Sequence, residues 1–189
     1  MTFLITAGPT REPIDPVRYI SNRSSGKMGY AIAEAALDVG HDVILISGPV
    51  NLSPPRKAKF ISVSSTDEMF EAVHRHTDES DICVLCAAVA DYKPAEVSPV
   101  KIKKRAAQVS LELIPTRDIL QSLGRRQNRK FLLVGFAAET DHLEANATRN
   151  PFGGASAQTS RRTSAQHASV CRFSHPTHAS RLCRSACVS

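Results

Sequence analysis

The sequence predicts an α/β fold: a Rossmann-like, open and mostly parallel sheet with helices on both faces. Short apolar runs alternate along the chain with segments of helical periodicity, and several of these runs are apolar at nearly every position. Nearly continuous apolar runs are typical of parallel strands that helices cover on both faces. Most of the runs also end in small residues, which favours the same fold class.

The first third of the chain is expected to contain three strands and one helix. The run 3–8 (FLITAG) predicts a strand that ends at Gly8, and a long loop with three prolines then extends to Gly26. A helix is expected next, because apolar residues recur at helical spacing until Gly40, which favours a helix end. This apolar stripe consists of Met28, Ile32, Ala35, Ala36 and Val39. Strands are predicted over 42–48 (DVILISG) and 59–63.

The next part of the chain repeats the alternation. Thr66, Asp67 and Glu68 are typical of a helix start, although Thr66 and Met69 do not form a full capping box. The inner stripe of this helix is expected to be Met69, Phe70, Val73 and His76. The run 82–90 predicts a central parallel strand. A more exposed strand over 109–114, a helix over 117–125 and a buried strand over 131–138 complete the series.

Length, composition and charge narrow the functional classes. The chain has 189 residues, which suits one domain, and its 42% hydrophobic and 22% charged residues are a globular composition. No apolar stretch is long enough to span a bilayer, and Met1 precedes a strand-like run without a basic flank or cleavage site. We therefore expect a cytoplasmic protein without a membrane partner. Residues 151–189 carry almost all of the formal charge of +6, so the near-neutral body does not suggest nucleic-acid binding.

Cys83 and Cys86 have the C-x-x-C spacing that occurs in zinc and redox sites. The body contains no second pair at ligand spacing, and alternation along a strand points the two side chains to opposite faces. Buried structural thiols are therefore the favoured interpretation.

Ligands of an open α/β sheet bind beyond the carboxyl ends of its strands, where the strand order reverses. We therefore expect residues 7–29, 87–104 and 136–139 to surround one crevice. A candidate phosphate loop opens the first helix, where free backbone N–H groups and the helix dipole favour an anion. It consists of Ser24, Ser25, Gly26, Lys27 and Gly29. It matches neither a Walker A loop nor the G-x-G-x-x-G fingerprint, and a flexible helix start is the alternative.

Two charged features lie within 87–104. Lys101, Lys103 and Lys104 form a basic run, which is commonly a solvated face but could here reach a triphosphate from the loop after a buried strand. Asp91, at the expected end of that strand, could bind a magnesium ion or a ribose hydroxyl, or could cap a turn. These features alone do not identify a reaction, and the metal ligands stay unknown.

Four longer motifs resemble those of a known family. These motifs follow the order and approximate spacing that the family has. They are ITAGPTREPIDPVRYISNRSSGKMG at 5–29, AAVADYKPA at 87–95, KIKK at 101–104 and VGFAAET at 134–140. They resemble the bacterial phosphopantothenate–cysteine ligase (phosphopantothenoylcysteine synthetase) domain of bifunctional flavoproteins of coenzyme A biosynthesis. The resemblance covers residues 3–149. In that family the domain is commonly preceded by an FMN-dependent decarboxylase half, which is absent from this sequence.

The resemblance implies a reaction in two steps. The carboxylate of 4′-phosphopantothenate attacks CTP and gives an acyl-cytidylate and pyrophosphate, and the amine of cysteine then displaces CMP to form an amide. It also implies Mg²⁺, a homodimer, and a decarboxylase partner as a domain or as a separate chain. FMN is implied only for the decarboxylase half.

The resemblance also assigns site residues. Lys101 matches the lysine required for acyl-cytidylate formation, where a cation stabilises the charge that builds on the α-phosphate. Asn22 matches the asparagine required when cysteine attacks the intermediate. Arg18 and Ala87 match residues of the same step, Arg18 as a candidate contact for the substrate's phosphate and Ala87 through its backbone. The positions that match CTP contacts are Ala87, Asp91, Lys101, Arg117, Asp118, Ile119, Leu120 and Phe136. The family usually has Asn-Pro-Asp-Ile where this chain has Thr-Arg-Asp-Ile.

The resemblance ends after Arg149. Related chains continue through a charged helix with two CTP-contacting lysines, whereas residues 151–189 have eight Ser, five Arg and no Lys, Asp or Glu. We therefore divide the chain into a ligase domain over 1–150, incomplete at its carboxyl-terminal end, and a tail over 151–189. The tail is expected to be disordered, as the product of a shifted reading frame, and the chain to be nearly inactive.

Other interpretations stay open. The tail could instead be a basic nucleic-acid arm or a Cys/His metal segment, although its Cys and His spacing fits no standard zinc pattern. The whole chain could be a nucleotide-binding fragment without turnover, or a Rossmann-type reductase.

Overall fold

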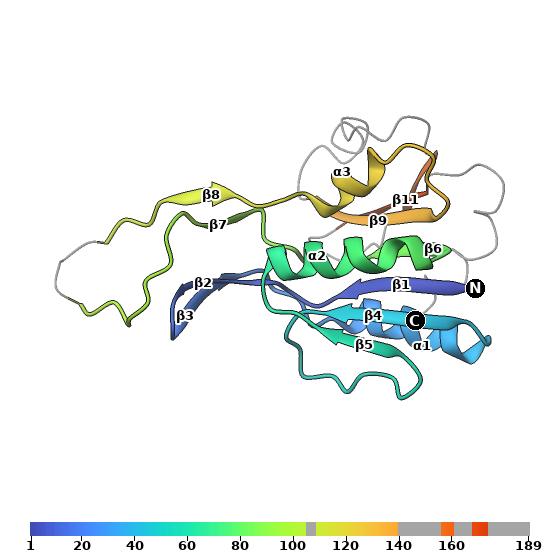
Figure 1. Cartoon of the computed structure of the whole chain (residues 1–189), viewed down its shortest axis with the longest axis horizontal. Helices are drawn as coiled ribbons and strands as arrows, with labels where there is room; N and C mark the ends of the chain where they lie inside the picture. The colour runs from blue at the N-terminus through green and yellow to red at the C-terminus, as the bar shows by residue number, and fades with distance from the viewer. Residues whose placement is uncertain (105–108, 140–155, 161–167, 174–189) are drawn as a thin grey trace.

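The main sheet of the computed structural model has the strand order of a Rossmann fold. The structure describes residues 1–104, 109–139, 156–160 and 168–173. Within them, five parallel strands lie in the order β9-β6-β1-β4-β5 (Figure 1). Their bounds are β1 Thr2–Ala7, β4 Asp42–Ser47, β5 Lys59–Ser62, β6 Ile82–Leu85 and β9 Leu132–Glu139. The chain thus runs outward on one side of β1 and then returns to the other side, which confirms the predicted fold class.

Helices cover both faces of this sheet, as expected. Helix α1 (Lys27–Asp38) packs on one face, and α2 (Thr66–His76) and α3 (Ile119–Gly124) pack on the other, with a short 3-10 helix, η1 (Thr77–Glu79), after α2. Successive side chains of β1 point to the two faces of the sheet alternately. Phe3 and Ile5 belong to the core under α1, whereas Leu4 belongs to the core under α2 and α3.

The thiols of Cys83, in β6, and of Cys86, directly after it, follow the same alternation. Cys83 is fully buried in the core under α2, and Cys86 packs against the core under α1. Burial raises the pKa of the Cys83 thiol to about 12, so it stays protonated at neutral pH and is a poor metal ligand or nucleophile. The structure therefore confirms a buried structural thiol at Cys83, whereas Cys86 is only partly buried.

The buried face of α1 is only partly the predicted one. Ala36 is buried as predicted, but Met28 and Val39 are 45% and 70% exposed, and Gly29, Tyr30 and Ala33 are buried in addition. The cause lies at Gly29, where a Cβ would come within 2.6 Å of the Cβ of Ala7. The helix backbone lies directly on β1 at this point, and this contact sets which side of α1 faces the sheet.

Helix α2 begins one residue later than its capping residue, which is Ser65 and not Thr66. The Ser65 hydroxyl accepts from the backbone N–H of Glu68 at 3.2 Å, and the Glu68 carboxylate accepts from the N–H of Ser65 at 3.4 Å. This reciprocal pair is a full capping box, so the expectation that the box is incomplete was wrong by one position. Met69 and Val73 of the predicted inner stripe are buried, together with Ala72.

An arm of short antiparallel strands extends from the carboxyl ends of the parallel strands (Figure 1). The region expected to be a loop contains a hairpin of β2 (Arg11–Asp15) and β3 (Arg18–Ser21), and β7 (Tyr92–Pro94) pairs with β8 (Leu113–Pro115). The exposed strand predicted over 109–114 is therefore shorter, shifted and outside the main sheet. Sequence patterns missed the hairpin because its side chains lack the regular alternation of a half-buried strand.

Two segments of the tail are described, and both are strands. Strand β11 (Ala168–Phe173) pairs antiparallel with β9, and β10 (Ser156–Ser160) pairs with β11. These two segments differ from the disorder expected for 151–189. Backbone hydrogen bonds explain the difference, because without β11 one side of β9 would expose unpaired N–H and C=O groups. The division of the chain at residue 150 stays a prediction, and 151–155, 161–167 and 174–189 lie outside the described residues.

Candidate functional site

The loops that follow β1 and β6 run side by side beyond the carboxyl edge of the sheet. The backbone of Ala88 donates to the carbonyl oxygen of Gly8 at 2.8 Å and accepts from the N–H of Thr10 at 3.3 Å. Strand β6 was predicted to continue to Ala90, but its regular pairing stops at Leu85 because the chain turns into these loop contacts. Residues 7–29 and 87–104 therefore meet where the strand order reverses, as predicted. Phe136 follows the last residue of β9 that pairs with β6, at the same edge.

Gly48, directly after β4, lies against the loop after β1. A Cβ at this position would be 1.8 Å from the carbonyl oxygen of Pro9, a backbone atom that cannot rotate away. We expect G48A to lower the free energy of unfolding by about 3 kcal/mol, measured by urea denaturation, because the loop must move. The control G40A places a Cβ in open space but at a φ of +83°, so it should cost only about 1 kcal/mol. Equal losses in the two variants would contradict this close approach.

The predicted phosphate loop adopts a tight conformation at the start of α1. Gly26 is the N-cap residue with a φ of 75°, and as a glycine it has no side chain that could cap the helix. The Ser24 hydroxyl accepts from the N–H of Gly26 at 3.3 Å, and the Ser25 hydroxyl accepts from the N–H of Lys27 at 3.5 Å. A Cβ at Gly26 would lie 2.9 Å from Cγ1 of Val50, so the segment is packed on its neighbours. Anion binding here stays a prediction.

Asn22 and Ala87 are anchored on the paired loops. The Asn22 side-chain amide donates to the carbonyl oxygen of Val89 at 2.9 Å, which joins the end of the β2–β3 hairpin to the loop after β6. The N–H of Ala87 donates to the hydroxyl of Thr6 at 3.2 Å. Asp91 is exposed, and its carbonyl oxygen accepts from the N–H of Thr116 at 2.9 Å.

The loop that carries Lys101 rests on the same hairpin. The Arg18 guanidinium donates to the carbonyl oxygen of Ile102 at 2.9 Å and pairs with the Asp15 carboxylate at 3.2 Å. Burial alone would raise the pKa of Asp15, but backbone N–H donors and the Arg18 cation together hold it below its usual value. Arg18 was predicted to contact a substrate phosphate; in the structure its two partners are protein groups. Lys101 itself is exposed.

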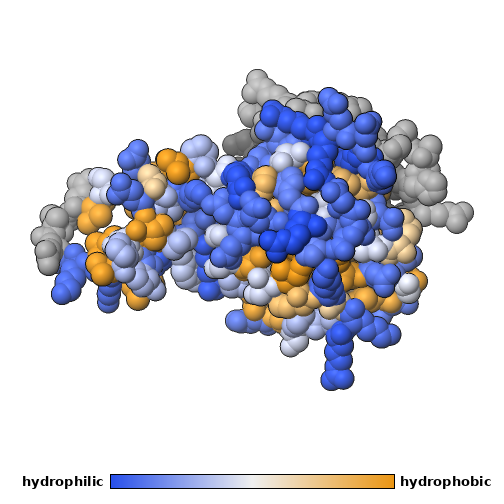
Figure 2. Space-filling view, viewed as in Figure 1, coloured by the Kyte–Doolittle hydropathy of each residue, from blue (hydrophilic) through white to orange (hydrophobic). Residues whose placement is uncertain are grey.

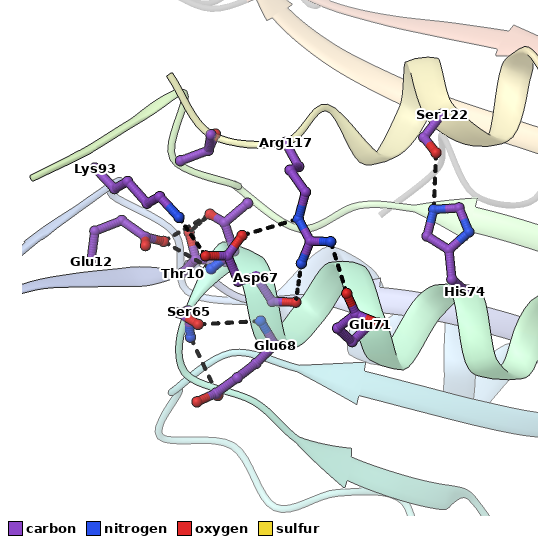
Figure 3. Close-up of polar contacts among 12 residues, drawn as sticks. Thr10, Glu12, Ser65, Asp67, Glu68, Glu71, His74, Lys93, Arg117 and Ser122 are labelled. Carbon is purple, nitrogen blue, oxygen red and sulfur yellow. Dashed lines mark hydrogen bonds and ion pairs between the residues drawn. The ribbon is translucent and has the colours of Figure 1, made fainter. Parts of the chain in front are cut away.

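A buried polar cluster, which the sequence analysis missed, connects these loops to α2 (Figure 3). One oxygen of Glu12, which is 1% exposed, accepts from the N–H and the hydroxyl of Thr66 at 2.9 and 2.7 Å. The hydroxyls of Thr66 and Thr10 are 3.0 Å apart, and the Thr10 hydroxyl accepts from the N–H of Ala90 at 2.9 Å. The signal in the sequence was a carboxylate directly before Pro13 in the hairpin, but its partner is 54 residues away.

The side chain of Arg117, predicted to contact CTP, is committed to helix α2 (Figure 3). Its guanidinium pairs with Asp67 at 3.1 Å and Glu71 at 2.8 Å and lies 4.0 Å from the ring centre of Phe70. These carboxylates raise the pKa of Arg117, Glu71 most strongly. Lys93 also pairs with Asp67, and its hydrogen bond is the main reason that the pKa of Asp67 is lowered.

The rest of the 117–120 segment also has structural roles. The Asp118 carboxylate caps α3 by accepting from the N–H of Gln121 at 2.8 Å, and Ile119 is buried in the core. Leu120 packs against Gly135, where a Cβ would lie 2.8 Å from a Leu120 methyl carbon. Nucleotide contacts by residues 117–120 stay a prediction. Because the side chains of this segment already have structural roles, we expect such contacts to use its backbone groups.

The described ranges contain neither a metal-binding cluster nor a membrane-spanning helix. No group of three or more His, Cys, Asp or Glu side chains there is placed to hold a metal ion. None of the helices in that part of the chain is long and apolar enough to cross a bilayer.

Comparison with known proteins identifies the family. The sequence profile of the DNA/pantothenate metabolism flavoprotein C-terminal domain matches residues 1–151. The chain belongs to this family. A solved structure, the C-terminal domain of coenzyme A biosynthesis bifunctional protein CoaBC, is 49% identical with a TM-score of 0.68, over 78% of this chain and 69% of that one. The family indicated by the four motifs is thus confirmed.

Curated relatives of the family are considerably longer. Coenzyme A biosynthesis bifunctional protein CoaBC of Bacillus subtilis (strain 168) is 53% identical over 147 residues, which are 77% of this chain and 36% of the relative. The protein of the same name from Escherichia coli (strain K12) is 47% identical over 150 residues, 78% of this chain and 37% of the relative. The chain thus spans about 37% of the length of such relatives. The DNA/pantothenate metabolism flavoprotein of Streptococcus pneumoniae, 24% identical with a TM-score of 0.62, supports the fold alone.

Proposed function

We propose that the domain is a CTP-dependent ligase that joins 4′-phosphopantothenate to cysteine. The observation that carries this proposal is the position of the β2–β3 hairpin, which contacts both loops that hold motif residues. Arg18 in β3 bonds to the Lys101 loop, and Asn22 after β3 bonds to the loop of Ala87. Residues that match the family's functional positions thus lie in three segments, 18–22, 87–91 and 101–104. The hairpin and its end contain the first segment and bond to the other two.

The proposed chemistry needs no covalent enzyme intermediate. An oxygen of the 4′-phosphopantothenate carboxylate bonds to the α-phosphorus of CTP, and pyrophosphate leaves with the electrons of the broken P–O bond. The nitrogen of cysteine, after loss of a proton, then bonds to the acyl carbon and CMP leaves. In this scheme Lys101 stabilises charge on the α-phosphate, and Asn22, a neutral amide, holds the acyl-phosphate during the second step.

The described residues are compatible with Mg²⁺ that is bound together with the nucleotide. Mg²⁺ is commonly held by one or two carboxylates, water and substrate phosphates, without a full set of protein ligands. The exposed carboxylate of Asp91, at the carboxyl edge of the sheet, is the group that we assign to it. The ion would neutralise triphosphate charge.

We propose a homodimer in which a second copy covers the arm. Figure 2 shows apolar side chains gathered on the arm, and Val100, Leu113 and Ile114 are 68%, 43% and 37% exposed. Exposed apolar side chains grouped in this way are typical of protein interfaces. Sedimentation velocity of the full chain should give twice the monomer mass of 20.5 kDa.

The test of the function uses the full chain with CTP, 4′-phosphopantothenate and cysteine. Pyrophosphate release without cysteine reports the first step, and mass spectrometry with cysteine reports the amide product. Calorimetric titrations with CTP and with NADPH separate the alternatives. CTP binding without pyrophosphate release would indicate a nucleotide-binding fragment, and NADPH binding without CTP binding would indicate a reductase.

The tail has a test of its own. A chimaera in which the corresponding region of the Bacillus subtilis relative replaces residues 151–189 should turn over roughly a hundredfold faster than the 189-residue chain, since it regains phosphate-binding groups. Steady-state product formation in both proteins is the measurement. Equal rates would show that residues 151–189 support catalysis and that our interpretation of them is wrong.

A further inference from the structure

Asp15, the last residue of β2, has a fully buried carboxylate with partners on two sides. Its Oδ1 accepts from the N–H groups of Val17 and Arg18, both at 2.9 Å, and so closes the turn between β2 and β3. Its Oδ2 accepts from the N–H of Ile102 at 3.1 Å and pairs with the Arg18 guanidinium at 3.2 Å. The side chain is 0% exposed, and it bonds to a segment 87 residues away.

Ile102 is held at both of its peptide groups. Its N–H donates to Asp15, and its carbonyl oxygen accepts from Arg18 at 2.9 Å. The N–H of Ile102 belongs to the same peptide unit as the carbonyl of Lys101, so this bond fixes the backbone from which the lysine side chain extends. A third bond, from the N–H of Ser98 to the carbonyl oxygen of Ile14 at 2.9 Å, attaches the preceding part of the loop.

We propose that Asp15 is a positioning residue that sets the place of the Lys101 ammonium, and that it acts through Arg18 and the backbone of Ile102. The proposal rests on the function proposed above. A long, exposed lysine gains catalytic value only if its backbone is held, because displacement of a reacting or stabilising group by about 1 Å can cost roughly a hundredfold in rate. Asp15 supplies that support from a buried position without touching the substrate.

The variant D15N tests the contacts of the Asp15 Oδ2 atom separately from those of its Oδ1 atom. The asparagine oxygen can still accept from Val17 and Arg18, but the amide nitrogen then faces the Ile102 N–H and the Arg18 guanidinium, which are also donors. We expect faster hydrogen–deuterium exchange in peptides that cover 98–104 of the full chain. The kcat of pyrophosphate release should fall about a hundredfold with little change in the KM for CTP. The matched control D38N changes an exposed aspartate at the end of α1 and should alter neither measurement.

A double-mutant cycle with K101Q tests whether Asp15 acts through Lys101. If it does, D15N should cause no further loss of pyrophosphate release in the K101Q background. The rates are measured in the full chain and, for a larger signal, in the chimaera. Losses that multiply fully in the double variant, or exchange over 98–104 that is unchanged in D15N, would overturn the proposal.

A second pair of variants covers the case in which D15N does not fold. I102P removes the donor to Asp15 and leaves the hairpin intact, whereas V100P places a proline in the same loop where the N–H contacts only the nearby Ser98 hydroxyl at 3.4 Å. I102P should lose pyrophosphate release and V100P should keep most of it, and equal rates would overturn the proposal. Absence of release from the unsubstituted proteins would instead contradict the proposed function.

Discussion

K101Q should nearly abolish acyl-cytidylate formation. Glutamine keeps most of the length of the side chain but removes the cation that the proposed mechanism places at the α-phosphate. Loss of such a preorganised contact costs about 2.7–4 kcal/mol, which is roughly a hundred- to a thousandfold in rate. The measurement is pyrophosphate release from CTP and 4′-phosphopantothenate in the chimaera, followed without cysteine so that only the first step is observed.

The basic run supplies its own controls. Lys103 and Lys104 are exposed neighbours of Lys101, but the bonds to Asp15 and Arg18 are made at Ile102. K103Q and K104Q should each slow pyrophosphate release only a fewfold, as expected for screened charges on a surface. Similar losses in all three variants would reduce the run to a general electrostatic patch, and unchanged release in K101Q would refute the assignment of Lys101.

N22D should let the acyl-cytidylate accumulate and slow amide formation by roughly a hundredfold. Aspartate keeps the shape of asparagine but places a negative charge beside an intermediate that is already anionic. Pyrophosphate release should therefore continue while the cysteine product is delayed. Mass spectrometry of quenched reactions of the chimaera would detect the intermediate directly.

The structure adds a second effect of this substitution, which a further variant separates. The Asn22 amide donates to the carbonyl oxygen of Val89 at 2.9 Å, and an ionised aspartate cannot make that bond. N22A removes the same bond without adding a charge. If charge is the main effect, N22A should accumulate less intermediate than N22D. Normal product formation in N22D, or no intermediate in either variant, would contradict the role given to Asn22.

The parallel α/β fold class, the burial of Cys83 and the motif residues were accessible from the amino-acid sequence alone. Each of them depends on residue type or on short-range periodicity. A continuous apolar run reports burial on two faces, and an alternation of two positions reports the face to which a side chain points. The motifs at 5–29 and 87–104 identified the family because they combine many specific residues in one order.

Only the tertiary structure decided the contacts that give those motif residues their places. The carboxylate of Asp15 bonds to a loop 87 residues away, and that of Glu12 bonds to Thr66, 54 residues away. Arg117 has the residue type of a nucleotide contact, yet its charge is matched by Asp67 and Glu71 on α2. The physical reason is that a polar side chain is stabilised by whichever partner the fold brings within about 3 Å, and local sequence patterns do not report distant partners.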